Sequence, residues 1–169
     1  LHRIPGIDFG PAQKWQGWFC TGSQECRTGD FNGDGKDDVA AFSRFQYGDA
    51  YVGLSSGSAF GPGAIWSTDL CSNVDHCEIA DFNGDGKDDV AVVVESPILA
   101  TDGDVRIALS TGNAFGPDLE WKDGMCANST CRFADMDGNG RADVLSFDSS
   151  GDVRVALATG STFGPTKLW

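Results

Sequence analysis

The chain has 169 residues and a formal net charge of −13 at pH 7. This length fits one domain that buries its own hydrophobic core. The acidic charge argues against nucleic acid as a partner, because the phosphate backbone is also negative. The longest apolar run, near residues 90–94, is far too short to cross a bilayer, so we expect no membrane insertion.

The first recognisable element follows a lead-in, residues 1–8, that carries little signal. Phe9-Gly10-Pro11 is followed by Trp15, and the same Phe-Gly-Pro…Trp pattern returns three times, ending at Trp66, Trp121 and Trp169. We expect a β-strand at each occurrence, including an additional strand at 9–15 that precedes the first complete repeat.

The six cysteines form three pairs at equivalent places, each beginning five residues after a repeated tryptophan. Zinc-binding thiolates usually stand as C-x-x-C with further ligands, whereas these spacings are wider. We therefore predict three short disulfides and an oxidising, secreted environment. The predicted pairs are Cys20–Cys26, Cys71–Cys77 and Cys126–Cys131.

Each second cysteine is followed by an acidic, glycine-rich loop. The loop at 30–38, DFNGDGKDD, is repeated letter for letter at 81–89 and returns as DMDGNGRAD at 135–143. Oxygen side chains occupy its positions 1, 3, 5 and 9, which is the ligand type that Ca²⁺ prefers. The helix-loop-helix calcium site is excluded, because it needs a glutamate at position 12, where this chain has Ala41, Val92 and Ser146.

We expect three calcium ions per chain. Position 6 of every loop is glycine, which allows the backbone to turn inside the ligands. Position 7 is expected to offer its backbone carbonyl while its side chain points to water. Eleven of the 25 acidic residues lie in these loops, so calcium ligation explains much of the negative charge. The expected ligands are Asp30, Asn32, Asp34, Lys36 and Asp38; Asp81, Asn83, Asp85, Lys87 and Asp89; and Asp135, Asp137, Asn139, Arg141 and Asp143.

Short β-rich segments surround each loop. An apolar strand follows it, and an alternating strand then begins with Gly-Asp at residues 48, 103 and 151. Each unit thus has four expected strands: one entering the loop, one leaving it, the Gly-Asp strand and the Phe-Gly-Pro…Trp strand. The tryptophans recur after 51, 55 and 48 residues, and a period near 50 is typical of propellers and repeat arrays. The pattern predicts one all-β domain over 1–169, with repeats at about 26–66, 77–121 and 131–169.

The D-x-N-G-D-G-x-x-D loops and the Phe-Gly-Pro elements resemble FG-GAP or VCBS-type repeats, over about residues 9–169. This resemblance implies four-stranded, calcium-binding β-propeller blades, as in integrin α-subunits, in secreted microbial proteins and in a fungal lectin that binds N-acetylglucosamine. The cysteine pairs are not part of the general family pattern. The third loop departs from the first two at positions 3, 5 and 8.

Three blades cannot close a ring, and family propellers usually have six or seven. A three-blade unit would leave apolar faces in water, which favours association. We therefore expect either a homodimer that completes the ring or a fragment of a longer propeller.

Catalysis is not expected. Gly53-Leu54-Ser55-Ser56-Gly57 resembles a nucleophile elbow, but the third repeat has Ala158 in place of the serine and no helix follows. A binding module fits better, with glycans as the first ligand class. Trp15, Trp66, Trp121 and Trp169 are candidate sugar contacts, although repeated tryptophans also pack between blades. The alternative function is a structural or protein-interaction scaffold without sugar binding.

Overall fold

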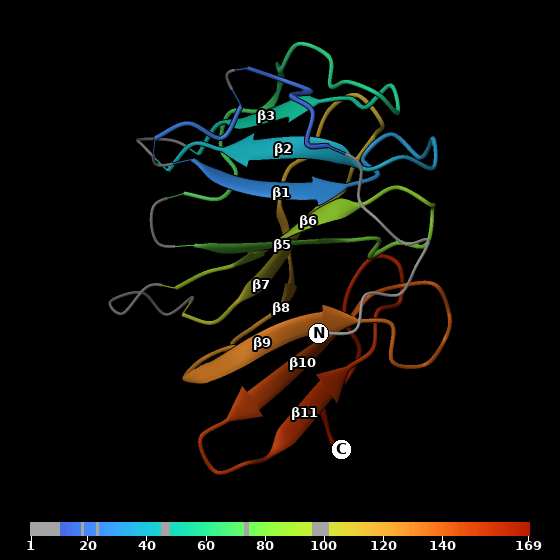
Figure 1. Cartoon of the computed structure of the whole chain (residues 1–169). Coiled ribbons are helices and arrows are strands. Elements are labelled where there is room, and N and C mark those ends of the chain that lie inside the picture. The colour runs from blue at the N-terminus through green and yellow to red at the C-terminus, as the bar shows by residue number, and fades with distance from the viewer. Residues whose placement is uncertain (1–10, 18, 23, 45–47, 73–74, 96–101) are drawn as a thin grey trace, which may run out of the picture.

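The structure is a computed structural model that describes residues 11–17, 19–22, 24–44, 48–72, 75–95 and 102–169. The described residues form strands, turns and loops without a helix, as the all-β prediction requires. None of them forms a helix long and apolar enough to cross a membrane. Figure 1 shows three sheets that follow one another along the molecule in chain order, from the blue and cyan sheet to the orange and red one.

Each sheet has four antiparallel strands, and every strand pairs with the next one in the chain. We refer to the three sheets as blades one, two and three. Blade one contains β1 (Glu25–Gly29), β2 (Asp38–Phe42), β3 (Ala50–Gly53) and β4 (Ala64–Ser67). Blade two contains β5 (His76–Ala80), β6 (Asp89–Val93), β7 (Val105–Ala108) and β8 (Leu119–Lys122). Blade three contains β9 (Ser129–Ala134), β10 (Asp143–Asp148), β11 (Val153–Ala156) and β12 (Lys167–Leu168).

The blades are arranged radially. The first strands β1, β5 and β9 lie next to one another, whereas the fourth strands of the described blades make no such contacts. Blade two lies between the other two blades, so its second strand is covered on both faces, which explains why β6, with the sequence DVAVV, is buried at all five positions. After Asp89, the sequence of this strand is a continuous apolar run because other blades pack on both of its faces.

Two apolar seams hold the blades together. The seam between blades one and two includes Phe31, Phe42 and Trp66 from one side and Val90 and Phe115 from the other. The seam between blades two and three is equivalent, and its members include Phe82, Ile107, Trp121, Val144 and Phe163. The same positions of the repeat thus build both seams.

The expected strand at 9–15 is not observed in its described part. Residues 11–15 are irregular, while residues 9 and 10 lie outside the described residues. In each blade the fourth strand pairs with the third, and β3, β7 and β11 already have β4, β8 and β12 as partners. A strand at 11–15 therefore has no ladder partner. Trp15 nevertheless accepts a hydrogen bond from the Phe60 N–H at 3.4 Å, the bond that Trp66 and Trp121 accept from Phe115 and Phe163.

The six cysteines are joined as Cys20–Cys26, Cys71–Cys77 and Cys126–Cys131, the pairs predicted from spacing. Each bridge closes the connector that leads into the first strand of a blade. Cys71 and Cys77 are buried, whereas Cys20 is exposed. The bridges therefore fix the chain at the start of each hairpin that carries an acidic loop.

Candidate calcium loops and the blade seams

The three acidic loops connect the first and second strands of each blade, so all three lie at the same end of their hairpins. At position 6, Gly35, Gly86 and Gly140 have φ values of 80°, 80° and 82°. Such left-handed backbone is costly for residues with a Cβ. Glycine is thus required at the sixth position for the chain to turn around the loop centre.

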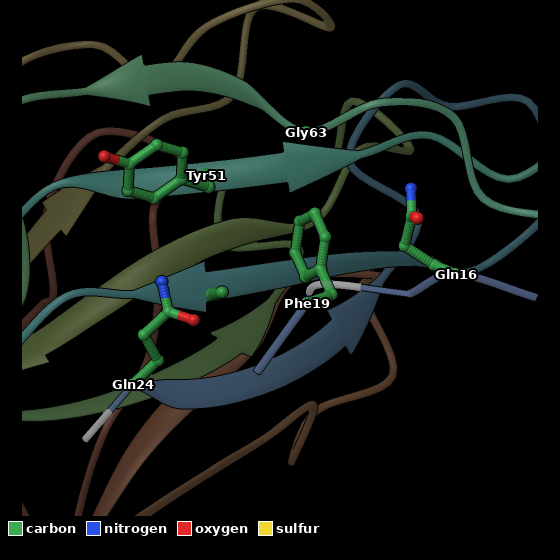
Figure 2. Close-up of a pocket in the computed structure, with 6 residues that line it drawn as sticks. Gln16, Phe19, Gln24, Tyr51 and Gly63 are labelled. Carbon is green, nitrogen blue, oxygen red and sulfur yellow. The ribbon is translucent and has the colours of Figure 1, made fainter. Parts of the chain in front are cut away.

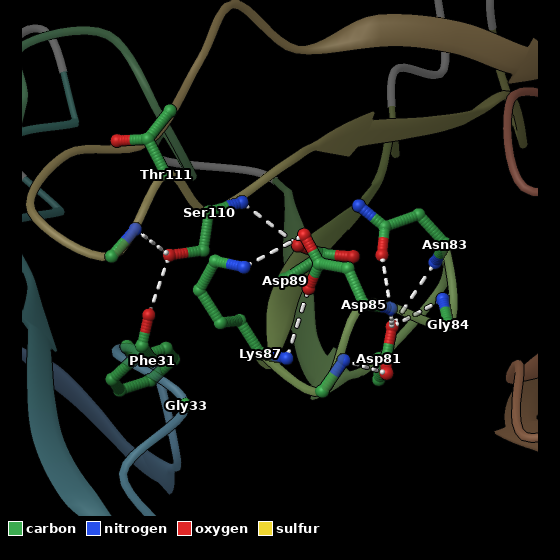
Figure 3. Close-up of polar contacts among 12 residues, drawn as sticks. Phe31, Gly33, Asp81, Asn83, Gly84, Asp85, Lys87, Asp89, Ser110 and Thr111 are labelled. Atoms are coloured by element: carbon green, nitrogen blue, oxygen red, sulfur yellow. Dashed lines mark hydrogen bonds and ion pairs between the residues drawn. The ribbon is translucent and has the colours of Figure 1, made fainter.

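The first aspartate of each loop lies at the centre and is held by backbone N–H groups. In the second loop, Asp81 accepts hydrogen bonds from Gly84 at 2.6 Å and from Gly86 at 2.8 Å (Figure 3). Asn83 Oδ1 accepts one from the Asp85 N–H at 2.8 Å. The first and third loops repeat this arrangement around Asp30 and Asp135. The backbone therefore aims the side-chain oxygens inward.

Two observations test whether these loops fit a cation. In the third loop, one carboxylate oxygen each from Asp135, Asp137 and Asp143 lie within 4.8 Å of one another. In the first loop, Asp38 Oδ2 is buried and has no hydrogen-bond partner among the residues that the structure describes. A buried carboxylate oxygen without a donor needs a compensating positive charge. An all-oxygen donor set of this kind fits a hard divalent cation such as Ca²⁺.

The aspartate at position 9 also connects the loop to the blade. Asp89 is fully buried, and it accepts hydrogen bonds from the N–H groups of Phe82, at 3.0 Å, and Ser110, at 2.8 Å. Burial raises the pKa of Asp89 to about 7; these two hydrogen bonds oppose the shift, and the carboxylates of Asp81 and Asp85 add to it. The carboxylate is therefore poorly compensated by the protein alone.

The side chains at position 7 do not simply point to water, contrary to our expectation. Lys87 Nζ lies 2.9 Å from Asp85 Oδ2, and the stem of Lys87 crosses to the loop of blade one, where a Cβ on Gly33 would lie 3.0 Å from it. Arg141 crosses in the same way to Gly84. Because these stems cover neighbouring backbone, they contribute packing between loops. Their carbonyls as calcium ligands stay a prediction.

Consecutive loops are also linked by hydrogen bonds that the sequence reasoning missed. The Asp88 N–H donates to the Asp30 carbonyl at 2.9 Å, and Asp88 Oδ2 accepts from the Asp30 N–H at 2.8 Å. Between the second and third loops, the Ala142 N–H donates to the Asp81 carbonyl at 2.8 Å. Position 8 is thus the linking position. In the sequence, the only sign of this linking role was that position 8 is aspartate in the first two loops and alanine, Ala142, in the third.

The four repeated tryptophans differ in environment. Trp66 and Trp121 are buried, with ring centroids 5.3 Å and 5.5 Å from those of Phe115 and Phe163 of the next blade. These two therefore have the packing role that the sequence offered as the alternative to sugar contact. Trp15 packs on Phe60 with 37% of its surface exposed, and Trp169 is 68% exposed.

Comparison with known proteins gives a match to one family model and one structural relative. A family model described as FG-GAP-like repeat matches residues 30–92, which contain the loops of blades one and two. No curated protein sequence matches the chain at a significant level.

Among solved structures, the chain is similar to a propeller lectin from Agrocybe aegerita, whose structure is described as the basis of specific recognition of non-reducing terminal N-acetylglucosamine. The two are 26% identical with a TM-score of 0.67. The likeness covers 83% of this chain and 37% of the lectin chain, so this chain spans little more than a third of that protein. Residues 30–92 thus match the FG-GAP-like repeat, the same kind of loop recurs in blade three, and the fold is all-β, built of four-stranded blades like those of a propeller lectin.

Proposed function

We propose that this chain is a calcium-stabilised carbohydrate-binding module of lectin type that acts outside the cell. The observation that carries the proposal is the likeness to a lectin that recognises non-reducing terminal N-acetylglucosamine, over 83% of this chain. N-acetylglucosamine is therefore the first sugar to test. The three disulfides support an extracellular location, because such bonds persist in oxidising compartments.

Calcium has a structural role in this proposal. The ion in each loop neutralises carboxylates that otherwise repel one another and leave Asp38 Oδ2 unsatisfied. Because each loop joins the first two strands of a blade, the binding free energy of the ion adds to the free energy of folding. Three ions per chain stabilise all three hairpins.

Binding without catalysis agrees with the environment of the serines in the elbow-like segments. The Ser110 hydroxyl is buried and donates a 2.7 Å hydrogen bond to the Phe31 carbonyl. It therefore joins two blades and is not held by a base. Ser55 is buried at the same position of blade one. The carboxylate group formed by Asp135, Asp137 and Asp143 belongs to a loop that fits a cation.

We also propose that a second copy of the chain covers the outer face of blade three. Met136, Phe147 and Trp169 are 37%, 41% and 68% exposed. The residues at the same positions are buried against the next blade in both other blades. They are Phe31, Phe42 and Trp66 in blade one, and Phe82, Val93 and Trp121 in blade two. Blade three thus presents an apolar face built for a neighbouring blade. A homodimer is the assembly that we favour.

A broad glycan array in calcium buffer tests the function. We expect binding to glycans with a non-reducing terminal N-acetylglucosamine, stronger at high glycan density because of effective concentration. An array without any bound glycan would reject the lectin function and favour the alternative, a scaffold that binds other proteins through its exposed apolar face.

A further inference from the structure

Blade one carries a small pocket on the side where the connector enters the blade. The cavity has a volume of about 250 Å³ and is lined by Gln16, Phe19, Gln24, Ala41, Tyr51 and Gly63. Figure 2 shows the ring of Phe19 between Gln16 and Gln24, over the face of blade one that carries Tyr51. The pocket is therefore built by one connector and one blade and needs no neighbouring chain.

The pocket exists because blade one departs from the repeat. Tyr51 and Arg106 hold equivalent positions in their blades. Tyr51 pairs with the residue that lies two positions after Gly63, and Arg106 pairs with the residue that lies two positions after Asp118. In blade two, Arg106 Nε lies 2.8 Å from Asp118 Oδ2, and this ion pair occupies the corresponding space. Blade one has Tyr51 and Gly63 in place of that pair, so its space stays open and uncharged.

Glycine is needed at two positions for the aromatic wall to form. A Cβ on Gly63 would lie 2.7 Å from Phe19 Cε2, and a Cβ on Gly53 would lie 3.2 Å from the same atom. Blade two has Asp118 and Ala108 at these positions, and blade three has Thr166 and Ala156. Only in blade one can an aromatic ring from the connector lie this close to the sheet.

The polar groups that line the pocket have fixed orientations and can still form further hydrogen bonds. Gln16 Nε2 donates to the Gly61 carbonyl at 2.9 Å, and its Oε1 accepts from the Gly17 N–H at 2.7 Å, so its orientation is fixed. Gln24 Oε1 accepts from the Thr21 N–H at 2.9 Å, which leaves its amide nitrogen without a partner among the described residues. The Tyr51 hydroxyl lies 3.5 Å from Asp49 Oδ2. Two amides and a phenol therefore surround an aromatic wall.

We propose that this pocket binds the terminal residue of a neutral saccharide, with a pyranose ring against Phe19 and Tyr51 and its hydroxyl or acetamido groups on Gln16 and Gln24. Small-ligand sites combine apolar or aromatic walls with a few oriented polar groups, as here. None of the six lining residues carries a charge, and the chain has a net charge of −13, so an anionic sugar gains no compensating cation. The assignment rests on the proposed carbohydrate-binding function and gives it a location.

The corresponding place in blade three is different. A cavity of about 570 Å³ is lined there by Met125, Ser129, Ser146, Arg154 and Thr166, among others. Arg154 stands at the position of Tyr51 and forms ion pairs with Asp148 and Asp152. The repeat thus places a cavity at equivalent points of two blades, and the residue at the Tyr51 position sets its chemistry. We assign the neutral sugar to blade one alone.

The test is calorimetric titration of monovalent N-acetylglucosamine into the calcium-loaded chain and three variants. Tyr51→Arg combined with Gly63→Asp introduces into blade one an ion pair like that of blade two, and the new aspartate displaces Phe19. Phe19→Leu places in the connector the residue type that blade two has there, Leu70, and removes the ring. Leu119→Ala is the control, because it removes an exposed apolar side chain from the fourth strand of blade two and does not line the pocket. Thermal unfolding of each variant verifies folding.

We expect affinity to fall about tenfold or more in the double variant and in Phe19→Leu, and to stay unchanged in Leu119→Ala. Titration of the unaltered chain with N-acetylneuraminic acid, an anionic sugar, should show no binding. If the chain binds N-acetylglucosamine and both pocket variants keep their affinity, the pocket assignment is wrong while the lectin function stands. Preference for the anionic sugar would overturn the neutral class. If the unaltered chain binds no glycan at all, the proposed function itself fails.

Discussion

Asp38, Asp89 and Asp143 show how one residue can serve both the fold and the candidate site. Each begins the second strand of its blade and is fully buried. Each also accepts a backbone hydrogen bond from the residue two positions after the third strand, namely Ser55, Ser110 or Ala158. Burial of a carboxylate is costly unless donors or a cation compensate it. A calcium ion in the loop would complete that compensation.

The pKa of Asp89 gives the metal-free protein an unusual pH dependence. Burial raises this pKa to about 7 from the ordinary value of 3.8, so between these pH values the folded state holds a proton that the unfolded state has released. Stability of the metal-free protein should therefore fall as pH rises from 4 to 7. Burial raises the pKa of Asp38 in the same direction.

Calcium should oppose this trend, because the ion needs ionised ligands and its stabilisation grows with pH. Melting temperatures of metal-stripped and calcium-loaded protein at pH 5 and pH 7.5 measure both effects. The gap between the two forms should widen at the higher pH. An equal difference in melting temperature at both pH values would show that these carboxylates are not calcium ligands.

Asp34 and Asp37 form a matched pair for testing the ligand set. Both are exposed and both lie in the first loop, but only Asp34 occupies a predicted ligand position. Asp34→Ala should lower the calcium content from three ions per chain to two, because the first loop loses an oxygen ligand. Asp37→Ala removes the same charge and should retain three ions. Elemental analysis after equilibration with calcium and desalting gives the count, and the same count in both variants would contradict the assignment.

The connection between blades depends on the loops as well as on the apolar seams. Asp88 links loop two to loop one through its side chain, since its Oδ2 accepts from the Asp30 N–H at 2.8 Å. Asp88→Ala leaves this N–H without its partner, and loss of such a bond costs about 1 kcal/mol. We expect a lower melting temperature in calcium buffer.

Asp88→Asn is the control for that variant. Its amide oxygen can still accept the hydrogen bond, so it should melt near the temperature of the unaltered chain. If the asparagine and alanine variants melt at the same temperature, the charge at position 88 matters and the hydrogen bond does not.

The strands and loops were predictable from sequence because they rest on local patterns. Alternating and apolar runs, a glycine at position 6 and a repeat period near 50 are properties of consecutive residues, and they predicted four strands per blade and the cysteine pairs. The contacts of Lys87 and Arg141 with the preceding loop were not predictable, because they join residues of different repeats. The additional strand at 9–15 was predicted wrongly in its described part, since pattern alone does not provide a pairing partner.

The pocket of blade one was missed for a related reason. Residues that recur in every repeat predict the blades, whereas this pocket is formed by residues that depart from the repeat, namely Tyr51, Gly53 and Gly63. The repeated tryptophans were the predicted sugar contacts, but Trp66 and Trp121 pack between blades. A position-by-position comparison of the three repeats was the signal that could have revealed the pocket.

At the scale of the whole molecule, the exposed face of blade three predicts association. The chain has a mass of 17.9 kDa, and light scattering in calcium buffer should give about twice this value. Trp169→Asp places a charge in the exposed face and should shift the protein toward the monomer, because a buried unpaired charge is costly. A calcium-loaded, folded protein that stays monomeric at all concentrations would contradict the homodimer.

The central claim is that calcium holds together a fold that binds carbohydrate. Its most direct test is titration of N-acetylglucosamine into one preparation in three states: loaded with calcium, stripped of metal by a chelator, and reloaded. The account predicts binding in the first state, loss or strong weakening in the second, and recovery in the third. Binding of equal strength in all three states, or no binding in the calcium-loaded state, would contradict it.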